Sequence, residues 1–423
     1  MKPSRADSHY MRLALELARR GYGSTSPNPM VGAVLVKRGK IIGRGWHRRA
    51  GEPHAEIEAL RSAQQHGHNP RQAILYVTLE PCSTQGRTPP CSAAIIAAGI
   101  RSLVVGATDP NPKHRGKAFE LIRRAGITVT QGVLANDCER LNEAFNHWIV
   151  HHTPFVTVKA AMTLDGKIAT AVGESKWITG GEARAYGMHL RHGADAVLVG
   201  INTILADDPN LTLRDLGFKG ARSSTAVASI PPTAPISISS KGLRRIVLDA
   251  HARTPLTSKI ANDSSAALTT IFVSEFAKRN RVKALAGRVK VCVAPAVEAR
   301  PRRQSSSPGV RSRGTDMRER TFPLRLDLDW ILRTLGAENV TSLLVEGGGE
   351  VNASFLMQGL AHRIAFCYAP RILGGRNAPT AVEGEGALLN DMLVARDLEW
   401  HRLGPDWLLS ARVTGQPGKV KPS

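Results

Sequence analysis

Hydrophobic side chains in the first third of the chain recur at alternating helical and extended spacings. Residues 9–20 place apolar side chains on one helical face, at Tyr10, Leu13, Ala14 and Leu17. A second helix is expected over 54–63 and a third over 92–98. Apolar, β-branched runs predict the strands between them, at 31–36, 41–45, 74–79 and 103–105. This alternation is typical of a layered α/β domain with a largely buried sheet.

The second half of the chain repeats the pattern. A strand is expected at 155–161 after Pro154, followed by a helix at 182–193 and a buried strand at 196–200. Residues 203–212 are expected to contain a turn. The remaining predicted strands are 245–249, 271–273, 289–293 and 342–345, and a helix follows through Phe355. We therefore predict a second α/β domain and place the boundary near residue 150, which gives domains 1–150 and 151–415.

Length and composition agree with two globular domains. A chain of 423 residues exceeds what one hydrophobic core usually supports, and 42% hydrophobic with 22% charged residues is ordinary for such a protein. No apolar run approaches the roughly 20 residues that a membrane span needs, and the first residues lack an apolar signal core. The 5 cysteines are scattered and odd in number, which indicates reduced thiols in the cytoplasm.

The net charge of +22 is the unusual bulk property. It is consistent with attraction of nucleic acid or of phosphorylated small substrates. Part of it lies in residues 298–320, where seven arginines face three acidic residues in a Pro/Ser/Arg-rich tract. We expect a mobile insertion near 295–321, since so few apolar residues cannot build a core. Without a nucleic-acid-reading motif, no nucleic-acid partner is expected.

One histidine and two cysteines form a candidate metal site. His54 and Glu56 lie at the predicted start of a helix, Cys82 follows a strand, and Cys91 precedes the next helix. Three such ligands suit Zn²⁺ and leave a fourth position for water, as in catalytic zinc sites. Nucleobase deaminases use His-x-Glu and Pro-Cys-x-x-Cys, whereas Cys91 comes six residues later here. A closed structural site, with His47 or His66 as fourth ligand, is the alternative.

A glycine cluster marks a second candidate site. The segment Leu343-Leu344-Val345-Glu346-Gly347-Gly348-Gly349-Glu350 joins a strand to a helix. Free backbone N–H groups at such a helix start favour an anion. The segment is not a dinucleotide-binding fingerprint, and a tight turn explains the glycines equally well.

Several motifs together resemble the RibD family of bifunctional riboflavin-biosynthesis enzymes. In the first half they are Pro27-Asn28-Pro29, His54-Ala55-Glu56, Pro81-Cys82-Ser83, Gly86-Arg87-Thr88-Pro89-Pro90-Cys91 and Asp109-Pro110-Asn111-Pro112. In the second half they are 159–166, Gly173-Glu174-Ser175, Trp177-Ile178-Thr179, Leu205-Ala206-Asp207-Asp208-Pro209, 211–214 and the Glu346 glycine cluster. The resemblance implies a cytidine-deaminase-like three-layer domain fused to a dihydrofolate-reductase-like domain.

The same resemblance implies residue roles in the first domain. Zinc would be held by His54, Cys82 and Cys91, and Glu56 would shuttle protons. Asn28 and His47 fall at substrate positions, and Arg87 at a basic position suited to the substrate's phosphate. Thr84 stands where a histidine is common in the family, so an impaired deaminase beside a working reductase is one alternative.

In the second domain the resemblance implies NADPH and a phosphorylated substrate. The cofactor positions would be Ala161, Trp177, Thr203, Asp207, Gly348, Gly349, Glu350, Val351, Asn352, Ala353 and Ser354. The substrate positions would be Ser175, Arg191, Leu211, Arg214 and Glu346. By residue type alone, Asp207 is equally a turn residue and Trp177 equally a core aromatic.

The expected function is a fused hydrolase and oxidoreductase for two consecutive steps of riboflavin synthesis. The first is hydrolytic deamination of 2,5-diamino-6-(5-phosphoribosylamino)pyrimidin-4(3H)-one. The second is NADPH-dependent reduction of the ribosyl chain to ribityl, giving 5-amino-6-(5-phosphoribitylamino)uracil. The alternatives are an RNA-directed nucleobase deaminase and a zinc-stabilised scaffold without catalysis. The resemblance also implies a homo-oligomer.

Overall fold

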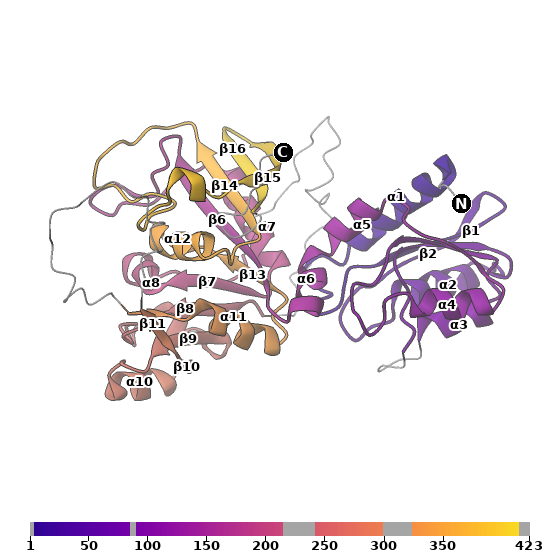
Figure 1. Cartoon of the computed structure of the whole chain (residues 1–423), viewed down its shortest axis with the longest axis horizontal. Helices are drawn as coiled ribbons and strands as arrows, with labels where there is room; N and C mark the ends of the chain where they lie inside the picture. The colour runs from indigo at the N-terminus through magenta and orange to yellow at the C-terminus, as the bar shows by residue number, and fades with distance from the viewer. Residues whose placement is uncertain (1–3, 85–89, 215–241, 299–323, 414–423) are drawn as a thin grey trace, which may run out of the picture.

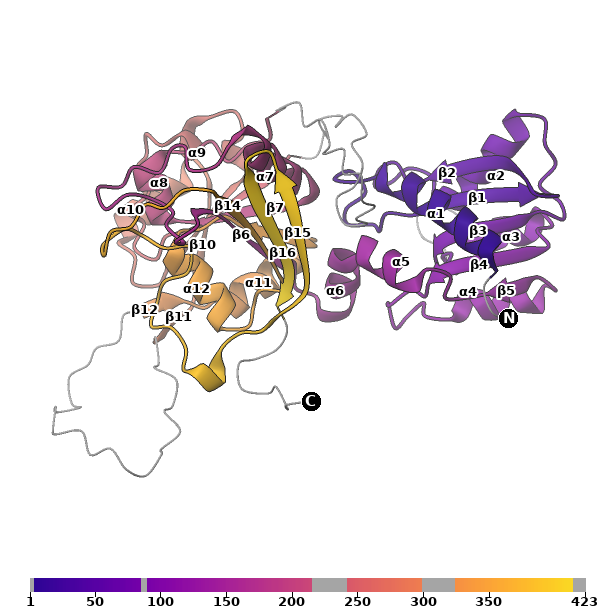
Figure 2. The same cartoon turned by 90° about the horizontal axis from the view of Figure 1, so that it is seen from above.

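Two α/β halves flank helix α6 (Glu143–His151) in a computed structural model of the chain (Figures 1 and 2). The structure describes residues 4–84, 90–214, 242–298 and 324–413. One half is built on a five-stranded sheet and the other on a nine-stranded sheet, with a two-stranded ribbon beside it. Within these residues, no helix is both long and apolar enough to cross a membrane.

The first sheet has the strand order β2-β1-β3-β4-β5. β1 is antiparallel to β2 and β3, whereas β3, β4 and β5 are parallel. The strands are β1 (Gly32–Lys37), β2 (Lys40–Trp46), β3 (Ile74–Leu79), β4 (Ser102–Ala107) and β5 (Thr128–Thr130). The helices are α1 (Arg5–Arg19), α2 (Ala55–Gln65), α3 (Cys91–Ala97), α4 (Lys117–Arg124) and α5 (Ala135–Leu141).

Alternation along the strands creates two buried faces in this half. Ala33 and Leu35 of β1 belong to a core with residues of α2, α3 and α4. The intervening Val34 and Val36 pack in a second core with residues of α1 and α5, including Met11. Because successive strand residues point to opposite faces, both faces are apolar and both are covered by helices (Figure 1). The expected three-layer domain is confirmed.

The second sheet has the order β10-β9-β8-β7-β13-β6-β14-β16-β15. Neighbours are parallel from β10 to β14, and the last three strands are antiparallel. Its strands are β6 (Phe155–Thr163), β7 (Ala196–Gly200), β8 (Arg244–Leu248), β9 (Thr269–Ser274), β10 (Lys290–Ala294), β13 (Ser342–Val345), β14 (Arg363–Ala369), β15 (Ala395–Leu403) and β16 (Asp406–Val413). The ribbon pairs β11 (Ala296–Glu298) with β12 (Leu324–Leu326).

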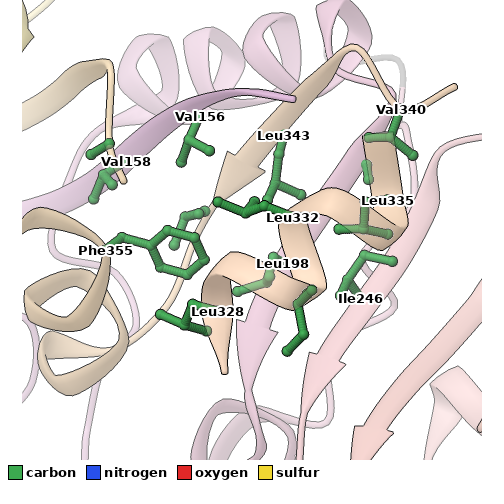
Figure 3. Close-up of a cluster of buried hydrophobic side chains, with 14 of the residues drawn as sticks. Val156, Val158, Leu198, Ile246, Leu328, Leu332, Leu335, Val340, Leu343 and Phe355 are labelled. Carbon is green, nitrogen blue, oxygen red and sulfur yellow. The ribbon is translucent and has the colours of Figure 1, made fainter. Parts of the chain in front are cut away.

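Helices cover both faces of this sheet. They are α7 (Gly181–Gly193), α8 (Ile201–Asp207), α9 (Lys259–Asn262), α10 (Arg279–Ala286), α11 (Leu328–Ala337) and α12 (Gly349–Met357), with short 3₁₀ turns at Ala266–Leu268 and Leu389–Asp391. Figure 3 shows Leu332 of α11 and Phe355 of α12 pointing at Val158 and Leu343 on the strands. Phe355 is fully buried. This core fixes the position of α12, and therefore of the glycine cluster at its start.

Direct contacts join the two halves. Glu143 of α6 accepts hydrogen bonds from Arg363 and Arg412, each at 3.0 Å. The ring of Tyr22 stacks on that of His189 with centroids 4.6 Å apart. Charged and aromatic contacts from the first half are thus made directly on the second sheet and its helix α7.

Most predicted strands and helices are confirmed within one or two residues, and β3 and β13 have the expected bounds. The turn expected within 203–212 is preceded by the short helix α8, so that prediction was incomplete. The Arg-rich tract 298–320 and the connection 216–242 lie almost entirely outside the described residues, as does the expected insertion near 295–321.

Gly32→Ala tests the packing of α1 against the first sheet. A Cβ at this position would lie 1.9 Å from the carbonyl oxygen of Ala14 in α1. We expect the free energy of unfolding to fall by roughly 1–3 kcal/mol, the usual cost of overpacking, measured by chemical denaturation. Gly181→Ala is the control because the nearest atom to its Cβ is 3.9 Å away. Equal stability of the two variants would contradict this packing.

Candidate active sites

The three predicted metal ligands come together at the N-termini of α2 and α3 and the end of β3. His54 is the N-cap of α2, Cys82 follows β3, and Cys91 is the first residue of α3. The Nδ1 of His54 lies 3.6 Å from Sγ of Cys82 and 3.3 Å from Sγ of Cys91. Tetrahedral zinc with ordinary bond lengths would separate such atoms by about 3.5 Å. The residues therefore fit a single zinc ion.

No fourth protein ligand joins this group within the described residues. His47 is close to His54, but its Nδ1 lies 3.2 Å from the carbonyl oxygen of Pro53 and its Nε2 lies 3.2 Å from Asn28. The Nδ1 of His66 lies 2.7 Å from the carbonyl oxygen of Ser62. Both alternative ligands are engaged elsewhere, so the geometry favours an open, catalytic site over a closed one.

Glu56 lies on the first turn of α2 beside the metal group. It is 3% exposed, and burial raises the pKa of its carboxyl to about 7, with the charge of His54 opposing the rise. A carboxyl group near this pKa can both accept and return a proton at neutral pH.

A hydrogen bond joins Cys82 and Cys91. The backbone N–H of Cys91 donates to Sγ of Cys82 at 3.2 Å. Hydrogen bonding from Cys91 and from His54 lowers the pKa of the Cys82 thiol against the effect of burial. A thiolate is the form that ligates metal.

The remaining predicted residues of this site are placed unequally. Asn28 and His47 are in contact, as given above, and Asn28 also lines a cavity of about 280 Å³ between the two halves. Thr84 is exposed and lies 3.4 Å from Nδ1 of His114, measured from its Oγ1. Arg87 lies outside the described residues.

The glycine cluster of the second half lies where parallel strands end. Glu346 follows β13, and its backbone N–H donates to the carbonyl oxygen of Leu198 in the neighbouring strand β7 at 2.9 Å. A Cβ on Gly349 would lie 2.4 Å from the carbonyl oxygen of Thr380, so packing requires that glycine. No described heavy atom lies within 4 Å of a Cβ built on Gly348. The backbone at the start of α12 is therefore open to an anion.

Arg191 and Glu346 form a buried ion pair. The Nη2 of Arg191 lies 2.5 Å from Oε2 of Glu346, and the two side chains are 10% and 12% exposed. Arg191 also donates to the carbonyl oxygen of Thr212 at 3.3 Å, beside the predicted Leu211. Burial pushes the pKa of Glu346 upward, but Arg191 and Lys159 outweigh it and hold the pKa below its ordinary value. The ion pair holds both side chains in place and keeps Glu346 ionised.

A separate cluster holds other predicted residues. The hydroxyl of Ser175 donates to Asp207 at 3.2 Å, and Lys176 lies 3.5 Å from the same oxygen. Asp207 ends α8 rather than standing in a plain turn. Trp177 is 64% exposed, so its reading as a core aromatic is wrong, and the guanidinium of Arg184 lies over its ring.

The remaining predicted cofactor and substrate positions of the second half lie in β6, in α8, in α12 and in the segment after α8. Ala161 is in β6, Thr203 is in α8, and Arg214 is exposed in the irregular segment that contains Leu211. Glu350, Val351, Ala353 and Ser354 lie in α12, as does the fully buried Asn352, which donates to the carbonyl oxygen of Ala381 at 2.8 Å.

Comparison with known proteins decides the family. The RibD C-terminal domain model matches residues 154–409, and the zinc-binding region of cytidine and deoxycytidylate deaminases matches residues 4–107. Riboflavin biosynthesis protein RibD of Aquifex aeolicus is 40% identical over 87% of this chain and 88% of its own. The chain belongs to the RibD family.

Other members agree over almost the whole length. RibD of Actinobacillus pleuropneumoniae is 37% identical over 95% of this chain and 94% of its own. The structure of RibD from Acinetobacter baumannii matches with a TM-score of 0.76 and 31% identity, covering 97% of this chain and 99% of that one. A Thermotoga maritima deaminase/reductase structure matches with a TM-score of 0.74.

The expected fold class and function are confirmed. The protein is a bifunctional riboflavin-biosynthesis enzyme of the RibD family, with a zinc-dependent, cytidine-deaminase-like domain and an NADPH-dependent reductase domain. The alternatives of an RNA-directed deaminase and of a non-catalytic scaffold are not supported by this family membership.

Two residues that adjoin the sites, Lys159 in the second half and His114 in the first, received no individual role from the sequence. Lys159, in β6, acts electrostatically on Glu346, and His114 contacts Thr84. Lys159 carries a weak signal, an isolated charge within an apolar strand. His114 carries none, because its contact joins loops 30 residues apart.

Removal of zinc should separate the two activities. Because His54, Cys82 and Cys91 lie in the first half only, treatment with a chelator should abolish ammonia release while NADPH oxidation with deaminated substrate continues. Zinc content and both rates would be measured on the same sample, and added zinc should restore ammonia release. Parallel loss of both activities would contradict independent sites.

Proposed function

We propose that the first site hydrolytically deaminates 2,5-diamino-6-(5-phosphoribosylamino)pyrimidin-4(3H)-one. The observation that carries this proposal is the open group of His54, Cys82 and Cys91 with the buried Glu56 beside it. The Thermotoga maritima relative, 31% identical, is described as a diaminohydroxyphosphoribosylaminopyrimidine deaminase and a 5-amino-6-(5-phosphoribosylamino)uracil reductase. That name supplies the substrate.

Glu56 carries the proton transfers of this step. Zinc, when bound, supplies an acidified water for attack on the amino-bearing ring carbon. The Glu56 carboxyl would carry one proton of that water to the ring nitrogen and then the second, from the resulting hydroxyl, to the departing amino group. Asn28 and His47, held against each other at 3.2 Å, contact the pyrimidine, and Arg87 binds its phosphate. Ammonia and the uracil derivative leave.

The second site reduces the ribosyl chain of that product to ribityl, giving 5-amino-6-(5-phosphoribitylamino)uracil. The open backbone at Gly348 and the start of α12 hold a phosphate of NADPH. Thr203, Asp207, Ala161 and Trp177, with Gly349 to Ser354, complete the cofactor site. NADPH, when bound, supplies the hydride, and the protein positions the two reactants.

Charged residues of the second site select the substrate. Arg214 is exposed three residues after Leu211 and binds the substrate's phosphate. Glu346, fixed by Arg191, accepts hydrogen bonds from polar groups of the substrate, and Ser175, which donates to Asp207, contacts it as well. These residues hold the sugar in one orientation toward the nicotinamide.

The protein works in the cytoplasm as a homo-oligomer with domains 1–150 and 151–415. Support for self-association comes from the sheet edge, where β15 and its neighbour β16 expose Leu398, Trp400 and Trp407 by 54%, 53% and 46%. Exposed aromatic side chains are enriched at interfaces. Light scattering on the purified protein measures the state directly, and a monomer at all concentrations would contradict it.

Identification of the products by mass spectrometry tests both steps. Without NADPH, the diaminopyrimidine substrate should convert to a product in which one amino group is replaced by oxygen. With NADPH, that product should gain a hydride and a proton on the sugar. Recovery of unchanged substrate under both conditions would refute the proposal.

A further inference from the structure

Glu80, two residues before Cys82, holds the loop between β4 and α4 through hydrogen bonds. Its side chain is buried, and the residue is 5% exposed. One of its carboxylate oxygens accepts the backbone N–H groups of Asp109 at 3.2 Å and Gly116 at 3.0 Å, and the other accepts that of Ala118 at 3.2 Å. One buried carboxylate therefore fixes both ends of the loop relative to the zinc ligands.

Short side-chain turns hold the loop between those ends. The Asp109 carboxylate accepts the backbone N–H of Asn111 at 2.9 Å, and Oδ1 of Asn111 accepts that of Lys113 at 3.0 Å. The backbone N–H of His114 donates to the carbonyl oxygen of Asn111 at 2.9 Å. His114 is thereby held in place although it lies at the surface.

His114 meets the metal-ligand segment at Thr84. Its Nδ1 lies 3.4 Å from Oγ1 of Thr84, two residues after Cys82. In the tautomer in which Thr84 donates to Nδ1, the proton of the ring is on Nε2, which makes this nitrogen a donor for a ligand. The contact is long and exposed, so an incoming acceptor displaces little.

The surroundings of His114 are strongly basic. Lys113, Arg115 and Lys117 are its neighbours in sequence and all three are exposed. Asp109, the nearest acid of the loop, already accepts the N–H of Asn111. Donors and positive charge beside the metal-ligand segment favour a phosphorylated ligand.

We propose that His114 is a substrate-binding residue of the deaminase that contacts the phosphate of the substrate, and that Glu80 is its positioning residue. This inference rests on the proposed deamination of a phosphorylated pyrimidine. The ring of the substrate would lie at the metal group, with its phosphate near Thr84 and directed toward His114 and the basic residues beside it.

The His114→Ala variant tests the binding role with two substrates. With the phosphorylated diaminopyrimidine we expect KM to rise about tenfold, the usual effect of losing a hydrogen bond to a charged group, and kcat and zinc content to stay unchanged. With the dephosphorylated nucleoside form, the variant and the unchanged protein should have equal KM. His68→Ala, an exposed histidine after α2, is the matched control and should leave both KM values unchanged.

Three outcomes would overturn the inference in distinguishable ways. Equal KM of His114→Ala and the unchanged protein on the phosphorylated substrate refutes the role of His114. A lower kcat with constant KM would show that His114 acts on the chemical step and does not bind the substrate. Absence of ammonia from the unchanged protein refutes the proposed deamination itself, and with it this inference.

Glu80→Gln tests the positioning role. An amide has one acceptor oxygen in place of two and cannot accept all three N–H groups. We expect KM for the phosphorylated substrate to rise severalfold with zinc retained, and no additional rise when His114→Ala is combined with it. Full additivity of the two KM effects would show that Glu80 does not act through His114.

Discussion

The Glu56→Gln variant is expected to lose ammonia release by about 100- to 10,000-fold, the usual contribution of a positioned acid–base group. Glutamine keeps the size of the buried side chain, which is 3% exposed, but cannot take a proton from water. Zinc content should stay at one per chain because Glu56 is not among the three ligands. NADPH oxidation with deaminated substrate should be unchanged.

Glu58→Gln is the matched control for this variant. Glu58 lies on the same helix turn, is 19% exposed, and pairs with Arg48 and Arg61, whose side chains are 56% exposed. Its substitution should leave ammonia release and zinc content unaltered, since exposed ion pairs contribute little. Ammonia release by Glu56→Gln at the control's rate would show that Glu56 does not carry the proton transfers of the deamination.

The Arg191→Met variant is expected to lose reductase activity by at least about 100-fold and to destabilise its domain by roughly 3–5 kcal/mol, because it leaves a buried charge unpaired. Arg191 is 10% exposed and contacts Glu346 through both Nε and Nη2. NADPH oxidation and chemical denaturation measure the two effects. Ammonia release should be retained.

A double substitution separates charge pairing from catalysis. Arg191→Met combined with Glu346→Gln should regain stability relative to Arg191→Met alone, since no unpaired charge remains, but should stay inactive as a reductase. Arg333→Met, at a surface ion pair on α11 that is 72% exposed, is the control for loss of an arginine. A stable, active Arg191→Met variant would contradict the assignment of the pair to the site.

The Arg191–Glu346 pair also makes the free energy of unfolding depend on pH in the acid range. The pKa of Glu346 is lower in the folded chain than its ordinary value of 4.5. Its ionised form is therefore favoured by folding, so the contribution is complete above pH 4.5 and is lost as the pH falls through the folded pKa.

The zinc group could be predicted from the sequence because its ligands stand at the ends of strongly patterned elements. His54 begins a helix, Cys82 follows the apolar strand β3, and Cys91 begins another helix. Each end is recognisable from local periodicity, and three soft ligands at such ends are specific to zinc chemistry. The layered fold followed from the same periodicity, since both sheet faces needed apolar residues.

Contacts between distant segments could not be predicted in this way. Arg191 and Glu346 are separated by 155 residues, and nothing in either local pattern states that they meet. The attachment of the 109–116 loop by Glu80 is similar, since a carboxylate after a strand has no sequence signal for its partners. The helix α8 was missed because Asp207, Asp208 and Pro209 at its end are residue types typical of a turn.

The central claim, two consecutive activities on one chain, is tested most directly by one time course. The purified protein would receive the diaminopyrimidine substrate and NADPH, with ammonia and NADPH absorbance followed separately. Ammonia release that begins at once, followed by NADPH loss after a lag that supplied deaminated product removes, is the predicted result. NADPH loss that precedes ammonia, or the absence of both signals, would contradict the account.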